Sequence, residues 1–323
     1  MNTSSNPLIL VGAGGMARDY AHVLKALPHP FQVIGRSETS ALAFEQETGI
    51  SVRRGGLNAL ASDLRGAPSA IVAVGVEALH ETTVALIAGG VRRILVEKPA
   101  GLDGAQIDAL SRLADATGTE LYVAYNRRFY SSVRHARKIV AADGGLQTFS
   151  FEFTEWAHEI VGLAKAPGVK PNWVLGNSSH VLDLAFFLGG APTVLYPMHD
   201  GSLSWHPASS RFVGCGATKS GALFSYQANW DAPGRWGVEL CTSQHRIVLR
   251  PMETLQVMRK GSISIDPLET ENAELDKRFK PGLYLQTSAF LHGDAGAELC
   301  PIAEHRARLD TYLRIAGYPP IEE

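Results

Sequence analysis

The chain has 323 residues, 45% hydrophobic and 19% charged, which is typical of a globular protein long enough for two domains. A formal net charge of −2 gives no indication of a nucleic acid or an anionic membrane as partner. Cys215, Cys241 and Cys300 form no CxxC pair, which favours a reducing compartment over a disulfide framework or a structural zinc site. No secretion signal and no run of ~18 apolar residues is found, so we expect a cytoplasmic protein.

The N-terminal segment has the pattern of a dinucleotide-binding turn. Residues 7–11 (PLILV) predict a strand, and GAGGMA follows at once, which is GxGxxA with Ala17 as the third small residue. Gly12 suits the tight turn, Gly14 allows backbone to approach a pyrophosphate, and a helix over about residues 16–27 would point its positive end at the phosphates. The predicted cofactor contacts of this turn are Gly12, Gly14, Gly15 and Met16.

The end of the second strand indicates which nicotinamide cofactor binds. A strand over residues 31–34 is followed by Gly35-Arg36-Ser37, where an NAD-preferring sequence would place Asp or Glu. A guanidinium and a hydroxyl suit a 2′-phosphate, because Arg offers paired donors to phosphate oxygens. We therefore expect NADP(H) in preference to NAD(H), which stays possible; the alternative is that Arg36 is a solvated loop residue.

Strands and helices then alternate, as in a doubly wound parallel α/β sheet. Gly75 directly follows one strand, and His80 starts the next helix, where both would face the cofactor; His80 fits an ordinary helix position equally well. The expected strands are 70–74, 91–96 and 120–124, and the expected helices are 40–49, 78–89 and 104–118.

The strand rich in β-branched residues at 91–96 ends in Glu97-Lys98-Pro99. Proline cannot donate to a sheet ladder, so the strand stops there. Lys98 then lies at the carboxyl end of a parallel strand, where open α/β sheets bind ligands. A surface lysine at a strand end is the alternative, since most lysines are solvated.

After Ala124 the pattern changes to long alternating strands, which predict a second, α+β domain with a large, mostly antiparallel open sheet. We place the boundary near residue 123, with an NADP(H)-binding domain at 1–123 and a substrate-binding and oligomerisation domain at 124–323. The expected strands are 146–155, 193–196, 211–217, 222–230, 237–241, 246–250 and 255–259.

Residues 173–190 (WVLGNSSHVLDLAFFLGG) predict a helix in the second domain. Asn177 or Ser178 could cap it, and Gly189-Gly190 could end it. His180 and Asp183 share one face of this helix, although a lone histidine there is more often a core residue. The preceding irregular stretch at 156–173 could cover a site.

The GAGGMA turn, the EKP at residues 97–99, the YNRRF at 125–129 and the HVLD at 180–183 together resemble the glucose-fructose oxidoreductase, inositol dehydrogenase and MocA family. The likeness covers nearly the whole chain, and the motifs occur in the family's order. It implies a Rossmann domain followed by an open-sheet domain whose outer face mediates homodimers or homotetramers. It also implies a cis Lys98-Pro99 bond.

The resemblance also implies roles for particular residues. Lys98 matches the lysine that contacts the nicotinamide ribose and the substrate hydroxyl, and His180 matches the histidine that serves as acid/base. The aspartate that usually precedes that histidine by four residues is Gly176 here, so the familiar triad is incomplete. Further contacts implied are Glu97 for the cofactor and Asn126, Arg128, Trp173 and Asn177 for the substrate.

The function we expect is hydride transfer between nicotinamide and a hydroxyl- or ketone-bearing carbon of a sugar or nucleotide-sugar, with Lys98 and His180 handling the proton. Two alternatives stay open at this point. One is an imine reductase of the same fold, which would share Lys98 and the cofactor site. The other is a non-catalytic, cofactor-sensing regulator. The sequence indicates no metal site.

Overall fold

The computed structural model describes residues 7–56, 67–293 and 298–321. Its contacts divide the chain into two compact units. The first comprises Met1–Tyr125 and Leu283–Ala307, and the second comprises Asn126–Gly282 and Arg308–Glu323. Within the described residues, no helix combines the length and the hydropathy needed to cross a membrane.

The first unit is built on a seven-stranded sheet in the order β15-β6-β5-β4-β1-β2-β3. All neighbours among β1 to β6 pair in parallel, and only β15 is antiparallel. The resulting order 3-2-1-4-5-6 is that of the doubly wound dinucleotide-binding sheet, so the predicted fold class is confirmed. The strands are β1 (Leu8–Val11), β2 (Phe31–Gly35), β3 (Val52–Arg54), β4 (Ala70–Val72), β5 (Arg93–Glu97), β6 (Glu120–Ala124) and β15 (Cys300–Pro301).

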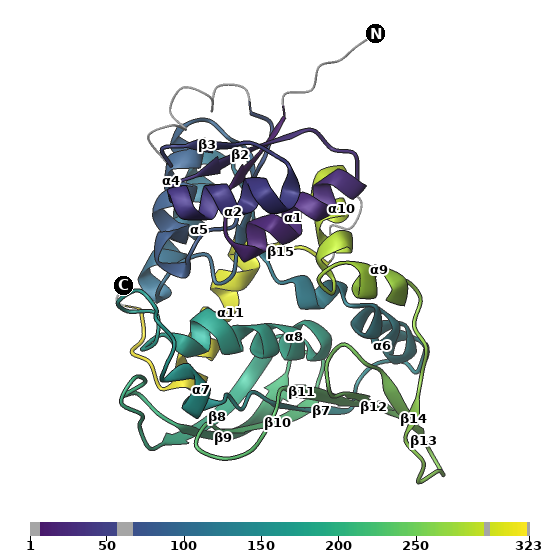
Figure 1. Cartoon of the computed structure of the whole chain (residues 1–323). Coiled ribbons are helices and arrows are strands. Elements are labelled where there is room, and N and C mark those ends of the chain that lie inside the picture. The colour runs from purple at the N-terminus through teal and green to yellow at the C-terminus, as the bar shows by residue number, and fades with distance from the viewer. Residues whose placement is uncertain (1–6, 57–66, 294–297, 322–323) are drawn as a thin grey trace. The chain divides into compact units, whose positions relative to one another are not determined.

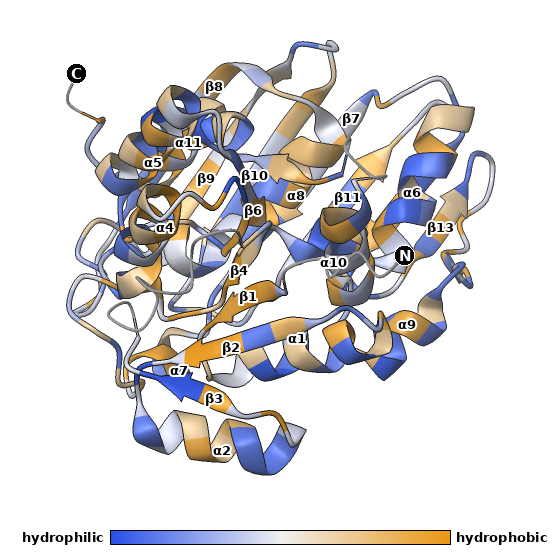
Figure 2. Cartoon of the chain, turned by 90° about the horizontal axis from the view of Figure 1, so that it is seen from above, coloured by the Kyte–Doolittle hydropathy of each residue, from blue (hydrophilic) through white to orange (hydrophobic). Residues whose placement is uncertain are grey.

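Burial explains why these segments form central strands. Every residue of β1 and β4 is buried, and Figure 2 shows both strands coloured as hydrophobic, whereas the arginines of the edge strand β3 are hydrophilic. Strand β3 is absent from the sequence prediction because only Val52 in it is buried and apolar. The associated helices are α1 (Gly15–Ala26), α2 (Glu38–Thr48), the short 3-10 turn η1 (Val76–Ala78), α4 (Leu79–Ala88), α5 (Gly104–Thr117) and α10 (Leu283–His292).

A late segment of the chain returns to the first unit. Strand β15 pairs with β6, and the α10 residue Gln286 accepts a hydrogen bond from Tyr20 Oη at 3.4 Å. The single domain boundary near residue 123 stays a prediction. The compact units divide after Tyr125, and residues Leu283–Ala307 belong to the first unit. Helix α11 (Ile302–Ala316) begins in that segment.

The second unit is built on an eight-stranded sheet in the order β14-β13-β12-β11-β7-β10-β9-β8 (Figure 1). Only β7 and β10 pair in parallel, which agrees with the mostly antiparallel sheet predicted. Its strands are β7 (Thr148–Glu152), β8 (Pro192–Asp200), β9 (Arg211–Thr218), β10 (Leu223–Asn229), β11 (Gly237–Cys241), β12 (His245–Leu249), β13 (Gln256–Arg259) and β14 (Asp266–Pro267).

Helix α8 (Ser179–Gly189) covers one face of this sheet, over β7 and β11. The alternation of β7 directs Phe149 and Phe151 to the face that α8 covers, where each contacts the ring of Phe186 edge-on. Phe149 also stacks on Phe224, with 5.3 Å between the ring centroids. The remaining helices and turns of this unit are η2 (Asn126–Phe129), α6 (Ser131–Ala142), α7 (Ala157–Ile160), the π-helical turn η3 (Val174–Ser178) and α9 (Ala273–Arg278).

A buried histidine connects the C-terminal segment to the rest of the second unit. His206 is fully buried, with Nδ1 2.6 Å from the Ser209 carbonyl oxygen and Nε2 2.6 Å from Tyr318 Oη. The Tyr318 hydroxyl also accepts from the backbone N–H of Val174 at 3.2 Å, at the start of η3. A neutral His206 completes this series of hydrogen bonds if its Nδ1–H donates to the Ser209 carbonyl and its Nε2 accepts from the Tyr318 hydroxyl.

Burial lowers the pKa of His206 below its ordinary value of 6.5. As the pH decreases below 6.5, His206 therefore binds a proton more readily in the unfolded chain than in the folded chain. The free energy of unfolding decreases until the pH is below the pKa of His206 in the folded chain. We expect the urea midpoint of the wild type to decrease between pH 7.5 and pH 5 by more than that of His206→Gln, which keeps a neutral donor and acceptor. Parallel pH profiles of the two proteins would contradict this prediction.

Candidate functional site

The turn after β1 has the geometry that a dinucleotide phosphate site requires. Gly12 has φ +122°, and a Cβ there would lie 2.2 Å from the carbonyl oxygen of Ala73, so only glycine fits. Added Cβ atoms on Gly14 and Gly15 would meet nothing within 4 Å, and both residues are exposed at the start of α1. Ala17 is fully buried, as close packing of helix on strand demands. The residues present therefore fit a pyrophosphate.

The predicted 2′-phosphate contacts follow β2, which ends at Gly35. Arg36 is exposed, and Ser37 caps α2 by accepting from the backbone N–H of Ser40 at 3.3 Å. The helix predicted from residue 40 thus begins two residues earlier, at Glu38, because Ser37 serves as its N-cap.

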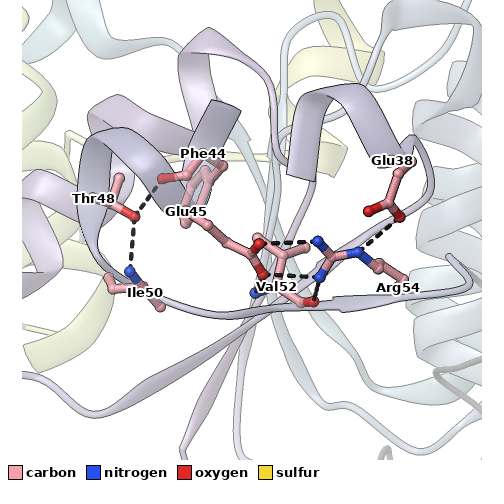
Figure 3. A network of polar contacts seen from close by, with 7 residues as sticks. All are labelled: Glu38, Phe44, Glu45, Thr48, Ile50, Val52 and Arg54. Carbon is pink, nitrogen blue, oxygen red and sulfur yellow. Dashed lines mark hydrogen bonds and ion pairs between the residues drawn. The ribbon is translucent and has the colours of Figure 1, made fainter. Parts of the chain in front are cut away.

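A neighbouring arginine at this edge is held by carboxylates (Figure 3). Arg54, the last residue of β3, donates from Nε to Glu38 at 2.8 Å and from both terminal nitrogens to Glu45 at 2.9 Å. These bonds, with the backbone N–H of Val52, lower the pKa of Glu45 to about 2. Arg54 is therefore neutralised within its own network, and it also neutralises Glu38, the acid nearest to Arg36 in sequence.

The EKP segment lies at the end of β5, and its Lys98-Pro99 bond is cis, as the resemblance implied. Lys98 is half-buried. Glu97 accepts a hydrogen bond from Tyr20 Oη at 2.9 Å, and burial together with that carboxylate raises the pKa of Tyr20. The carbonyl oxygen of Pro99 lies 3.1 Å from Nε2 of the fully buried His305. The turn that carries Lys98 is thus fixed on both sides.

Gly75 and His80 follow β4, which is a strand of the same parallel sheet. Gly75 is exposed and precedes the turn η1, and His80 is the second residue of α4 and half-buried. Because β1, β2, β4 and β5 run in parallel, the predicted cofactor residues after these strands lie at one edge of the sheet.

In the second unit, His180 follows an unusual helix start. The sequence suggested that Asn177 or Ser178 caps the helix; this was wrong, because the chain enters α8 through η3 with no side-chain cap bond. Short π-helical turns occur frequently at functional sites. His180 is 8% exposed, and its ring centroid lies 6.2 Å from that of Trp236.

Next to this helix start lies a cavity of about 430 Å³. Its walls include Trp156, Trp173 and Trp236, with the Arg127 guanidinium 5.0 Å above the Trp236 ring. Two predicted substrate residues, Trp173 and Asn177, line it. The indole nitrogen of Trp173 is buried and has no hydrogen-bond partner among the described residues. The other lining residues are Thr154, Glu155, Glu159, Ile160, Leu163, Arg235, Pro251, Met252 and Glu253.

The other two predicted substrate residues do not line this cavity. Arg128 is 1% exposed and forms a two-bond ion pair with Asp183, through Nε at 2.8 Å and Nη2 at 2.5 Å. Arg308 also reaches Asp183, at 3.1 Å. Asn126 is buried, and its side-chain amide donates to the Pro281 carbonyl at 2.9 Å. Their contact with substrate stays a prediction.

Sequence reasoning missed three residues that the structure brings to these sites: Glu155 and Trp236 at the cavity, and His305 behind Pro99. Each is far in sequence from the motif it joins, and none belongs to a local pattern. Glu155 was placed only as the end of a strand, and no periodicity distinguishes a buried carboxylate there from a solvated one.

No protein-family model matches the chain. A segment of 121 residues, 37% of the chain, is 34% identical to myo-inositol dehydrogenase Hyg17 from Streptomyces leeuwenhoekii, and it spans 36% of that protein's length. The chain thus matches about a third of this curated relative.

Solved structures match over almost the entire chain. UDP-N-acetylglucosamine 3-dehydrogenase GnnA from Acidithiobacillus ferrooxidans has a TM-score of 0.74 at 15% identity, with 96% of each chain covered. An NAD-binding oxidoreductase from Klebsiella pneumoniae has a TM-score of 0.76 at 17% identity, covering 97% of this chain and 96% of that one. Levoglucosan dehydrogenase, in complex with NADH and L-sorbose, has a TM-score of 0.75 at 15% identity, covering 96% and 95%.

These likenesses define the fold as that of the two-domain, dinucleotide-binding oxidoreductases. More narrowly, it is the fold of the glucose-fructose oxidoreductase, inositol dehydrogenase and MocA family, which confirms the resemblance that the motifs indicated.

The buried ion pair of Arg128 leads to a stability prediction. Replacing Asp183 by Asn leaves the guanidinium buried without its counter-ion, which costs about 3 kcal/mol of unfolding free energy. The matched control is Asp200→Asn, because Asp200 pairs with Arg211 at 2.5 Å on the exposed surface, where the loss of an ion pair should cost far less. Urea titrations measure both, and equal losses would contradict the prediction.

Proposed function

We propose that this protein is an NAD(P)-dependent oxidoreductase that transfers a hydride between nicotinamide and a hydroxyl- or carbonyl-bearing carbon of a sugar or nucleotide-sugar. One observation carries the proposal. The glycine turn and Lys98 follow strands that end at the same edge of a parallel sheet of order 3-2-1-4-5-6. The names of the similar proteins, which are dehydrogenases and oxidoreductases of sugars and cyclitols, support it.

The chain's own residues have distinct roles in this proposal. The nicotinamide ring, when bound, supplies the hydride chemistry at its C4 carbon. Gly12, Gly14, Gly15 and Met16 provide backbone and helix start for the pyrophosphate, and Gly75, His80 and Glu97 complete the cofactor contacts.

Lys98 and His180 handle the proton. A carbonyl that accepts hydride develops alkoxide charge, which the Lys98 ammonium group stabilises while His180 donates the proton. In the oxidative direction the imidazole accepts the proton from the substrate hydroxyl.

The substrate contacts are proposed to come from the cavity of the second unit. Aromatic rings provide flat apolar walls for the C–H faces of a sugar ring, and the buried Trp173 N–H and the Asn177 amide provide hydrogen bonds. Arg128 and Asn126 are also proposed to contact the substrate, although neither lines this cavity.

A homodimer or homotetramer is also proposed, formed through the open sheet. On β8, β9 and β10 the side chains of Tyr196, Met198, Val213 and Leu223 are 50% to 69% exposed, which makes an apolar strip on the sheet's outer face. Sedimentation of the full chain tests this directly.

Lys98→Ala separates an enzyme from a cofactor-sensing regulator. We expect turnover, followed by nicotinamide absorbance across a panel of sugars, cyclitols and keto-sugars, to decrease by about 10²–10⁴-fold, because the charge that stabilises the alkoxide is gone. Cofactor affinity should change only a few-fold. A wild type that binds cofactor but turns over no member of the panel would instead favour the regulator.

Arg36→Asp tests the cofactor preference. Loss of one charge-assisted phosphate contact should weaken NADPH binding by about 10–100-fold and leave NADH binding nearly unchanged. The measurement is energy transfer from the tryptophans to the reduced nicotinamide.

The matched control is Arg246→Gln, because Arg246 is an exposed arginine of β12 in the second unit, where it pairs with Glu239. It should alter the NADPH to NADH ratio little. If Arg36→Asp leaves that ratio unchanged, Arg36 is a solvated loop residue and the proposed NADP(H) preference is wrong.

A further inference from the structure

Glu155 is a buried carboxylate at the cavity that no motif identifies. It lies three residues beyond β7 and is 6% exposed. Its Oε1 accepts from Ser178 Oγ at 2.7 Å, and Oε1 and Oε2 both lie near Asn177 Nδ2, at 3.0 and 3.1 Å. A carboxylate this deeply buried is stable only when hydrogen bonds compensate its lost hydration, so these bonds are strong constraints on the chain.

Both donors belong to η3, the turn that leads into α8. Asn and Ser at this place would ordinarily cap the helix, but here their side chains are directed to Glu155 instead. The carboxylate also lies near the N-terminal end of α8, where the helix dipole favours a negative charge. Glu155 thus fixes the last two residues of the turn.

The turn is held from its other end as well. The backbone N–H of Val174 donates to Tyr318 Oη, and the Trp173 ring lies edge-on to Trp205 at 5.8 Å. Ser179 Oγ donates to the Leu175 carbonyl at 2.6 Å. With both ends of η3 fixed, the direction in which α8 presents its second residue, His180, is fixed too.

We propose that Glu155 is the positioning residue for His180: through Asn177 and Ser178 it sets the orientation of the imidazole, and its charge favours the protonated ring. The inference rests on the proposed acid/base role of His180. It supplies a carboxylate bonded to the turn that leads to the histidine, in a chain whose position 176, four residues before His180, is glycine.

Other charged groups of the second unit also act on His180. Asp183 lies one turn later on α8 but is paired with Arg128 and Arg308. Arg127 stacks on Trp236, which contacts the His180 ring, and as a cation it opposes protonation. A change at Glu155 leaves these groups in place, so its own effect can be isolated.

The test is the titration of His180 in the full-length protein, followed by the NMR signals of its ring nitrogens and assigned with His180→Gln. Glu155→Gln keeps the size and an acceptor for Ser178 but removes the charge. We expect the His180 pKa to decrease, because an anion in this region favours imidazolium. The matched control, Glu159→Gln, removes an exposed carboxylate from the same cavity and should leave the titration unchanged.

A rescue variant makes the test specific. An added Cβ at Gly176 meets no atom within 4 Å, and residue 176 is four positions before His180 on adjoining helical turns. Glu155→Gln combined with Gly176→Asp should therefore restore the titration of the wild type. If Glu155→Gln is too unstable to study, Glu155→Asp, which retracts the charge by one methylene, should give an intermediate value.

An unchanged titration in Glu155→Gln, or an equal shift in Glu159→Gln, overturns the proposal. Turnover is a separate readout: Glu155→Gln should lower kcat about tenfold and move its pH profile by the same amount as the His180 titration. If the wild type shows no turnover, the proposed function fails, and the titration still decides whether Glu155 positions His180.

Discussion

The parallel pairing of β1, β2, β4 and β5 is the constraint on which the first unit depends. Parallel strands end at one edge, so four loops that are distant in sequence converge there. The buried apolar strands fix the register, and the glycine at position 12 allows the first loop to pass within reach of Ala73. The proposed cofactor contacts all belong to the strand ends, loops and helix starts at this edge.

The second unit holds polar side chains in fixed positions next to an aromatic cavity and within its interior. It does so with long-range bonds: Glu155 to the turn before α8, Tyr318 to the start of that turn, and Asp183 between two arginines. Each of these bonds joins separate segments of the chain, so the geometry is specific but cannot be seen in any local sequence pattern.

Much of the fold was predictable because its signals are local. The strands of the first sheet are continuous apolar runs, and β7 alternates Phe149 and Phe151 with polar neighbours. The motifs placed Lys98 at a strand end and His180 on a helix. In contrast, β3 and β15 have two or three residues each and carry no pattern, and the return of Leu283–Ala307 to the first unit depends on pairing across about 180 residues.

The sequence by itself determined the doubly wound sheet, the glycine turn, the EKP strand end and the helix that carries His180, because hydrophobic period and turn chemistry are encoded in neighbouring residues. Only the tertiary structure decided which charged side chains are paired with one another and which can contact a ligand. It buried Arg128 against Asp183, neutralised Arg54 with Glu38 and Glu45, and brought Glu155 to Asn177 and Ser178. Such pairings depend on contacts between distant segments, which composition and spacing do not specify.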